Sequence, residues 1–219
     1  MFLLGSEHRF PPIELASNEG IVAIGGDLHP DRLIKAYHLG IFPWYSEGEP
    51  IVWYSPDPRM VLYPKEVKIS KSMRRILRNE DFTVTFNQNF KEIIKLCKTV
   101  QRKDQEGTWI TDELEKSMLQ LHEKGIAKSV EVWQSFDADP KDKKLVGGLY
   151  GLDFGNIFCG ESMFSLVSNA SKVAYISLAQ KLASENYLII DCQVYNDHLA
   201  SLGAVEISRA AFKKYLPTI

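Results

Sequence analysis

A carboxylate and an amide stand at the end of the apolar stretch Leu188-Ile189-Ile190-Asp191-Cys192-Gln193. Its β-branched content predicts a strand over residues 188–194. Because side chains alternate across a strand, Asp191 and Gln193 should share one face, with Cys192 on the other. A buried carboxylate is costly unless it is paired or used. Asp191 is therefore either a strand-end residue that caps a neighbouring loop or an acid of a functional site.

A second acid, Glu161, lies in the apolar run FCGESMFS at residues 158–165. The preceding Gly160 would allow another backbone or a ligand to approach closely. A glutamate in such a run is either a buried acid with satisfied hydrogen bonds or an acid that takes part in a reaction. Both readings remain open on this pattern alone.

Cysteine nucleophilic catalysis is the rival reading of the same strand. Cys192 has Asp191 beside it and His198 six residues further on. A nucleophilic cysteine needs a base within hydrogen-bond reach. In a regular strand Cys192 faces away from Asp191 and Gln193, and no second histidine has an equally polar setting. We therefore disfavour this reading and expect His198 to be a structural or capping residue.

A stripe of basic residues marks the helix that we predict at residues 71–79. Residues at i, i+3, i+4 and i+7 share one helix face, while Met73, Ile76 and Leu77 lie on the other. Residues 65–78 hold six bases and one acid, a local charge of +5 in a chain of net charge -2. Such a stripe is either a solvated face or a surface for phosphates. Its members are Lys71, Arg74, Arg75 and Arg78.

The four tryptophans all fall beside predicted loops or strand ends. Core packing is the default expectation for each of them. Trp44, after Phe-Pro, and Trp109, after Gly-Thr, are carried by loops, which makes them the better candidates for stacking on a base or another ring. Trp53 and Trp133 are expected to pack in the core.

The pattern of elements predicts an α+β fold with a mostly antiparallel sheet. A helix begins at Pro30 and ends before Gly40, because proline suits a first helical position and glycine the residue past the end. Asn169 or Ser171 could cap a later helix. We expect a small N-terminal domain over residues 1–64 and a larger one over 65–219. Helices are predicted at 71–79, 90–100, 112–124, 172–185 and 197–201, strands at 51–54, 82–86, 128–134, 145–152, 156–164, 188–194 and 204–207, and a polar hairpin at 135–144.

Composition limits the function classes. The chain has 219 residues, of which 45% are hydrophobic and 25% charged, the balance of a folded globular protein. Its three cysteines are odd in number and widely spaced, which indicates a reducing compartment and argues against a disulfide framework or a structural zinc site. No stretch reaches about 18 apolar residues, and the N-terminus turns polar too soon for a signal peptide. We expect a cytoplasmic protein without a membrane span, whose contacts with nucleic acid come from a local patch.

Ten motifs occur together in one order. They are GGDL (25–28), AYHLGIFPW (36–44), SPDPR (55–59), GTWIT (107–111), SVEVW (129–133), LVGGLYG (145–151), FCGESMFS (158–165), NASK (169–172), IDCQ (190–193) and HLASLGA (198–204). This set resembles the leucyl/phenylalanyl-tRNA–protein transferase family. The resemblance covers nearly the whole chain.

The resemblance implies a small N-terminal domain followed by a domain like the acyl-CoA N-acyltransferases, with no cofactor and no metal. It implies transfer of Leu, Phe or, less well, Met from aminoacyl-tRNA to proteins with an N-terminal Arg or Lys, which marks them for degradation. The implied catalytic residues are Asp191, Gln193 and Glu161. We expect a monomer whose aminoacyl-adenosine pocket includes Trp44, Trp109, Met163 and Phe158 and whose basic stripe binds tRNA.

Two other functions compete with this one. An acetyltransferase that uses acetyl-CoA would need a glycine-rich loop to hold the pyrophosphate at a helix N-terminus. Residues 166–171, which precede the predicted helix at 172–185, contain no glycine, and this weighs against CoA. A non-catalytic RNA-binding module would leave the polar residues Glu161, Asp191 and Gln193 unexplained.

Overall fold

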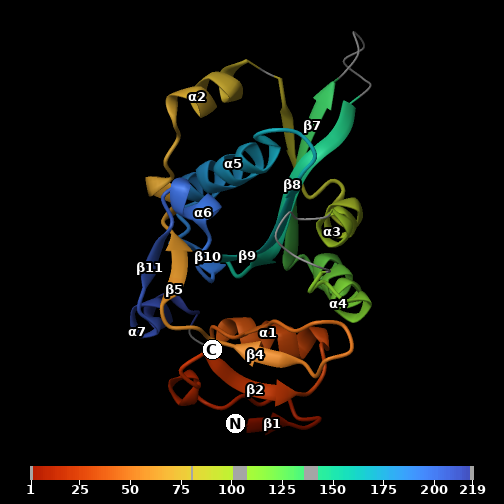
Figure 1. The fold of residues 1–219 in the computed structure, drawn as a ribbon, viewed down its shortest axis with the longest axis vertical. Helices are drawn as coiled ribbons and strands as arrows, with labels where there is room; N and C mark the ends of the chain where they lie inside the picture. The colour runs from red at the N-terminus through yellow and green to blue at the C-terminus, as the bar shows by residue number, and fades with distance from the viewer. Residues whose placement is uncertain (1, 80, 101–107, 136–142, 218–219) are drawn as a thin grey trace.

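The computed structural model describes residues 2–79, 81–100, 108–135 and 143–217. They form two sheets (Figure 1). The smaller sheet has the strand order β1-β2-β4-β3 and belongs to the N-terminal part of the chain. Its strands are β1 (Phe2–Leu4), β2 (Ile21–Gly25), β3 (Phe42–Pro43) and β4 (Val52–Tyr54). The sequence predicted β4 but missed the other three.

Helix α1 (Pro30–His38) was predicted from its start and end signals, and it lies between β2 and β3 in the chain. Pro30 occupies its first position, and the ring of His29 accepts a hydrogen bond from the backbone N–H of Asp31. Gly40 follows the end of the helix with a φ of 75°, a left-handed conformation that glycine adopts without strain. The buried face of α1, which includes Leu33, Ala36 and Tyr37, packs on the core.

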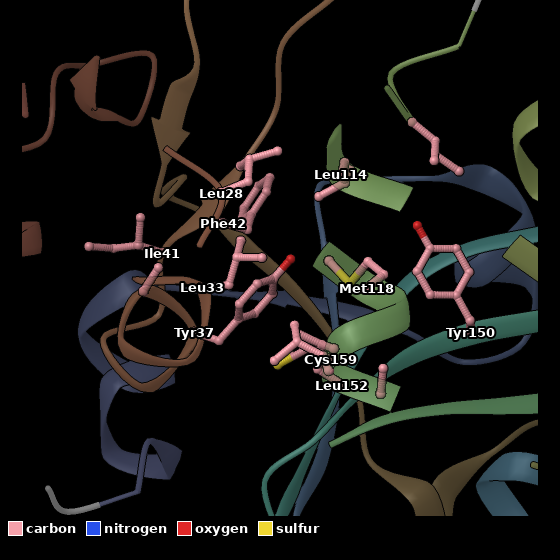
Figure 2. Packing of buried hydrophobic residues seen from close by; sticks show 14 of the residues in the cluster. Leu28, Leu33, Tyr37, Ile41, Phe42, Leu114, Met118, Tyr150, Leu152 and Cys159 are labelled. Atoms are coloured by element: carbon pink, nitrogen blue, oxygen red, sulfur yellow. The ribbon is translucent and has the colours of Figure 1, made fainter. Parts of the chain in front are cut away.

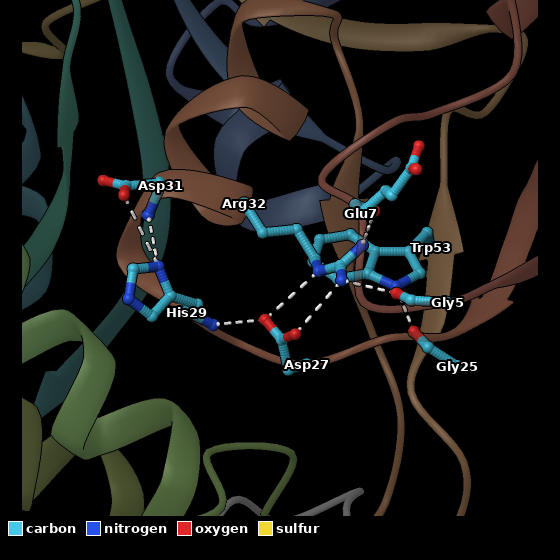
Figure 3. A network of polar contacts seen from close by, with 8 residues as sticks. All are labelled: Gly5, Glu7, Gly25, Asp27, His29, Asp31, Arg32 and Trp53. Carbon is cyan, nitrogen blue, oxygen red and sulfur yellow. Dashed lines mark hydrogen bonds and ion pairs between the residues drawn. The ribbon is translucent and has the colours of Figure 1, made fainter.

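A buried arginine ties the N-terminal segment to α1 (Figure 3). Arg32, fully buried, donates from Nε and Nη2 to the two carboxylate oxygens of Asp27, each at 3.1 Å. It also donates to the carbonyl oxygens of Gly5 at 2.7 Å and Glu7 at 3.0 Å. Trp53 is buried beside this network and donates its indole N–H to the Gly25 carbonyl at 2.8 Å, which matches its expected core role.

The larger sheet has seven strands in the order β11-β5-β10-β9-β8-β7-β6. All neighbours are antiparallel except β9 and β10, which are parallel, so the fold is the predicted α+β class with a mixed, mostly antiparallel sheet. The strands are β5 (Arg59–Leu62), β6 (Thr83–Phe86), β7 (Ala127–Ser135), β8 (Lys143–Asp153), β9 (Ile157–Ser165), β10 (Ile189–Gln193) and β11 (Val205–Ile207).

The chain passes from the smaller sheet to the larger one between β4 and β5. Strand β5 therefore belongs to the larger sheet although it precedes residue 64. The division of the chain at that residue stays a prediction. The predicted polar hairpin falls mostly outside the described residues, but β7 and β8 on either side of it pair up to Ser135 and Lys143.

Helices cover both faces of the larger sheet (Figure 1). Helix α5 (Ala170–Ser184) packs against β7 and β8 on one face, and α3 (Phe90–Thr99) and α4 (Asp112–Glu123) pack on the other. Asn169 takes the position before α5, but its side chain makes no capping hydrogen bond. The remaining helices are α2 (Lys71–Arg78), α6 (Asp197–Ser201) and α7 (Arg209–Phe212), with short 3-10 turns at Ile13–Leu15, Pro64–Glu66 and Lys213–Tyr215.

One hydrophobic core joins the two sheets (Figure 2). Leu33 and Tyr37 of α1 and Phe42 of β3 belong to the same buried cluster as Met118 of α4 and Cys159 of β9. Burial of apolar side chains contributes about 1.5–3 kcal/mol for each large one, which favours a fixed placement of α1 and β3 on the larger sheet. Among the described residues, no helix is both long enough and apolar enough to cross a bilayer.

Candidate active site

A cavity opens where β9 and β10 stop pairing. The two strands pair only from Ile157 to Cys159 and from Ile189 to Asp191, while β9 continues to Ser165. The cavity that begins there has a volume of about 700 Å³. Its walls come from β9, from α5, from β10 and the segment that follows it, and from residues 42–44 of the N-terminal part. Parallel strands that part in this way expose their last side chains and backbone to the space between them.

The cavity brings together the residues that the resemblance implied for catalysis and for the pocket. All seven line it: Asp191, Gln193, Glu161, Trp44, Trp109, Met163 and Phe158. Trp44 is 45% exposed and contacts the ring of Tyr54 edge-on, with 5.8 Å between the centroids. Phe158 is buried, and Trp109 and Met163 are half-buried. The aromatic side chain of Trp44 is thus the most exposed of these four.

Glu161 is the centre of a small polar cluster. One of its carboxyl oxygens accepts two hydrogen bonds, from the hydroxyl of Tyr37 at 2.7 Å and from the side-chain amide of Gln193 at 3.0 Å. Burial raises the pKa of Glu161 to about 8. The bond from Tyr37 and the charge of Arg59 act in the opposite direction, and the charge of Asp191 adds to the rise. At neutral pH the carboxyl group of Glu161 is therefore mostly protonated.

Asp191 is bound by an arginine that the sequence analysis did not single out. The guanidinium of Arg59, on the neighbouring strand β5, donates to both carboxylate oxygens at 2.8 and 2.7 Å. Both side chains are 1% exposed. The charge of the Asp191 carboxylate is therefore balanced by Arg59, and this pairing offsets the free-energy cost of burying the carboxylate.

The strand is not regular at Gln193. Its φ is 64°, and the pairing of β10 with β5 skips one residue between Asp191 and Gln193. An irregularity of this kind redirects a side chain. The backbone N–H of Gln193 donates to Asp191 Oδ1 at 3.0 Å, and its side chain reaches Glu161. The two residues do face one site, but a β-bulge brings this about and not the simple alternation that we expected.

Cys192 is buried against Tyr175 of α5, although it also contributes to the lining of the cavity. Its Sγ lies 3.0 Å from the hydroxyl of Tyr175, and burial raises the pKa of the thiol to about 12. A thiol that stays protonated at neutral pH is a poor nucleophile. The side chain that caps α6 is Asn196, so the capping role for His198 is wrong. His198 lies half-buried in the cavity wall.

The basic stripe lies apart from the cavity. Helix α2 buries Met73 and half-buries Ile76 and Leu77, and its four basic residues are exposed, as the spacing predicted. In the part of the chain that the structure describes, none of the four forms a salt bridge. Figure 1 shows α2 beyond α5, on the side away from the N-terminal sheet. None of the four lines the cavity.

Sequence reasoning missed two side chains that complete the polar cluster, Arg59 and Tyr37. Arg59 closes the SPDPR motif and opens the apolar strand β5, and a charged residue at that place was the available signal. Tyr37 lies on the buried face of α1, and its apolar neighbours there give no sign that its hydroxyl donates to Glu161. Among the described residues, no group of three or more His, Cys, Asp or Glu side chains could hold a metal ion.

Two models of one known protein family match consecutive parts of the sequence. The family model described as "Leucyl/phenylalanyl-tRNA protein transferase" matches residues 61–217, and the model for the N-terminal domain of the same family matches residues 26–57. A leucyl/phenylalanyl-tRNA–protein transferase of Flavobacterium johnsoniae is 57% identical, covering 99% of both chains. One from Pseudomonas aeruginosa is 48% identical and covers 98% of this chain and 92% of its own.

Comparison with solved structures finds FemX at a TM-score of 0.53 and 11% identity, over 81% of this chain and 66% of that one. The likeness is one of fold alone and agrees with the acyltransferase-like fold expected for the larger sheet. The family models and the curated relatives together cover nearly all of the sequence. The chain therefore belongs to the leucyl/phenylalanyl-tRNA protein transferase family and is an aminoacyltransferase.

Proposed function

We propose that the protein transfers Leu or Phe, and less well Met, from aminoacyl-tRNA to proteins whose N-terminal residue is Arg or Lys. The transfer would mark those proteins for degradation in the cytoplasm. The observation that supports this most is the composition of the cavity, which combines an exposed tryptophan and apolar walls with the polar cluster of Glu161 and Gln193.

The apolar part of the cavity suits the donor. Met163, Phe158, Leu178 and Ile190 offer apolar surface to the side chain of Leu, Phe or Met. Stacking of a base on an aromatic ring contributes about 1–3 kcal/mol, and we assign this role toward the terminal adenosine to Trp44 and Trp109. A polar aminoacyl side chain would lose its hydration in such surroundings, which disfavours tRNAs charged with polar amino acids.

The reaction needs little beyond orientation. The acceptor's amine attacks the ester carbonyl, a C–N bond forms, the bond to the ribose oxygen breaks, and one proton passes from the amine to that oxygen. Orientation alone can supply about 7–11 kcal/mol. A neutral amide is no general base. With its amide nitrogen bound to Glu161 at 3.0 Å, Gln193 can turn its carbonyl oxygen toward the amine and position it.

Glu161 suits the cationic acceptor. Asp191 is engaged on both oxygens by Arg59, so Glu161 is the acid that the cavity can offer to an incoming charge. A cation that enters beside it favours the ionised carboxylate and lowers its pKa from about 8. The carboxylate would then hold the acceptor's amine or its basic side chain close to Gln193.

The exposed bases of α2 suit the body of the tRNA. Contacts with phosphates position a nucleic acid without reading its sequence, and a transferase for several charged tRNAs needs that property. We assign the tRNA contact to Lys71, Arg74, Arg75 and Arg78.

One assay tests the proposal directly. Purified protein is mixed with radiolabelled Leu-tRNA and a peptide that begins with Arg, and a peptide that differs only in beginning with Asp is the matched control. We expect label to transfer to the first peptide and not to the second, without CoA. Transfer only to the Asp peptide, or turnover of acetyl-CoA in its place, would show that the acceptor or the donor is wrong.

A further inference from the structure

Arg59 is held on every side by the protein. Its guanidinium donates to both oxygens of Asp191 and, from Nη1, to the carbonyl of Gly40 at 3.1 Å. The rings of Phe42 and Phe212 lie against its central carbon, with centroids at 4.8 and 4.5 Å. Three segments that are distant in the sequence therefore fix one buried cation, and none of these contacts belongs to a substrate. Its orientation is set before any ligand arrives.

The carboxylate that Arg59 holds in turn holds the backbone of Gln193. Asp191 Oδ1 accepts from Arg59 Nε at 2.8 Å and from the Gln193 N–H at 3.0 Å. Gln193 has a φ of 64°, in a region where a residue with a side chain is strained unless its surroundings hold it. That conformation directs the Gln193 amide to Glu161. The position of the amide thus depends, through Asp191, on the arginine.

We propose that Arg59 is a positioning residue of the transfer reaction, which holds Gln193 in its reactive place through both carboxylate oxygens of Asp191. The inference rests on the proposed function, because it is Gln193 that meets the acceptor's amine there. Arg59 does not touch the reacting atoms, since Asp191, Gly40 and two aromatic rings enclose it.

The fork shape of the guanidinium matters more than its charge. Arginine can bind two carboxylate oxygens side by side while a third N–H reaches the Gly40 carbonyl. A lysine keeps the charge but carries a single ammonium group on a flexible stem, and it cannot fix a carboxylate in one plane. Arg59→Lys therefore keeps an ion pair in the core and removes the control over the Asp191 carboxylate.

Arg32 is a matched control within the same chain. It too is fully buried, binds both oxygens of one aspartate and donates to backbone carbonyls (Figure 3). It lies in the smaller sheet's network, and neither it nor its partner Asp27 lines the cavity. Arg32→Lys should thus disturb the fold in a comparable way without touching the support of Gln193.

The test compares the two lysine variants in two measurements. The first is steady-state transfer of Leu from Leu-tRNA to a peptide with an N-terminal Arg. Because a misplacement of about 1 Å can cost about 100-fold in rate, we expect Arg59→Lys to lower kcat by roughly 10- to 100-fold and to change KM for Leu-tRNA less than about twofold. In a Gln193→Ala background Arg59→Lys should lower kcat no further, because the two changes act on one group.

The second measurement is hydrogen exchange of the backbone N–H of Gln193, which needs no activity. This N–H should exchange faster by about 10-fold or more in Arg59→Lys, and its exchange rate should be unchanged in Arg32→Lys. If the wild type transfers no amino acid, the proposed function fails, and the exchange data still decide whether Arg59 holds Gln193. Normal kcat and normal exchange in Arg59→Lys, or equal losses in both lysine variants, would overturn the proposal.

Discussion

Replacing Glu161 by Gln should change how the stability of the protein depends on pH. Gln has nearly the same shape and can still accept hydrogen bonds from Tyr37 and Gln193, but it does not titrate. In the wild type, burial raises the pKa of Glu161 from 4.5 to about 8 in the folded state. Between these values the folded protein binds more protons than the unfolded chain, so the free energy of unfolding must fall as pH rises.

The size of the effect follows from the two pKa values. Linkage for one group with these values predicts that Glu161 contributes about 3.5 kcal/mol less to the free energy of unfolding at pH 8 than at pH 5. The contribution is fully present below pH 4.5 and is lost as pH rises through about 8. The wild type should therefore lose stability relative to Glu161→Gln across this window, while groups common to both proteins cancel in the difference.

Urea unfolding followed by tryptophan fluorescence at pH 5, 6, 7, 8 and 9 measures this difference. Tyr37→Phe is a useful companion, because it removes the hydrogen bond that lowers the Glu161 pKa and so should move the loss of stability to still higher pH. Parallel stability curves for the wild type and Glu161→Gln over the whole range would refute the reasoning. Glu161 would then ionise in the folded protein as it does in the unfolded chain.

Three further predictions concern tRNA, the thiol and the adenosine. Replacing Arg74, Arg75 and Arg78 by Ala should raise KM for all cognate tRNAs and reduce the slope of log affinity against log salt by roughly 0.7–0.9 for each lost phosphate contact, with an aminoacyl-adenosine donor unaffected. An unchanged slope would mean that tRNA binds elsewhere. Cys192→Ala should keep kcat within about twofold, and an inactive but folded variant would restore the nucleophile reading. Trp44→Ala should raise KM for charged tRNA and for aminoacyl-adenosine alike by roughly 5- to 150-fold, the equivalent of about 1–3 kcal/mol of stacking, and equal KM values would exclude that contact.

Elements with clear signals could be predicted from the sequence. The start and end of α1 follow from Pro30 and Gly40, and the apolar stripe of α2 places Met73 in the core. Strands β7, β8 and β9 are long and follow one another, so an antiparallel arrangement was expected and is confirmed. Strands β1, β3 and β5 have two to four residues each. They are too short for an alternation of apolar and polar residues to be recognised.

The internal geometry of the site could be predicted only in part. The acids and the amide were recognisable because Asp191 and Gln193 are polar residues at the end of an apolar stretch and Glu161 is an acid within one, and the structure brings all three to one cavity. The bulge at Gln193 depends on pairing with β5, and no residue type near Gln193 in the sequence predicts it. The arginine that neutralises Asp191 lies 132 residues away in sequence, so only the sheet order brings the two together.

The two acids of the cluster differ in charge because they differ in partners. Asp191 meets a guanidinium that matches both of its oxygens, so its charge is balanced within the protein and serves to hold Gln193. Among the described residues, the donors to Glu161 are neutral, the Tyr37 hydroxyl and the Gln193 amide, and burial raises its pKa to about 8. In the proposed reaction this division favours binding of the acceptor's amine, because Glu161 is then the acid whose charge the protein has not already paired.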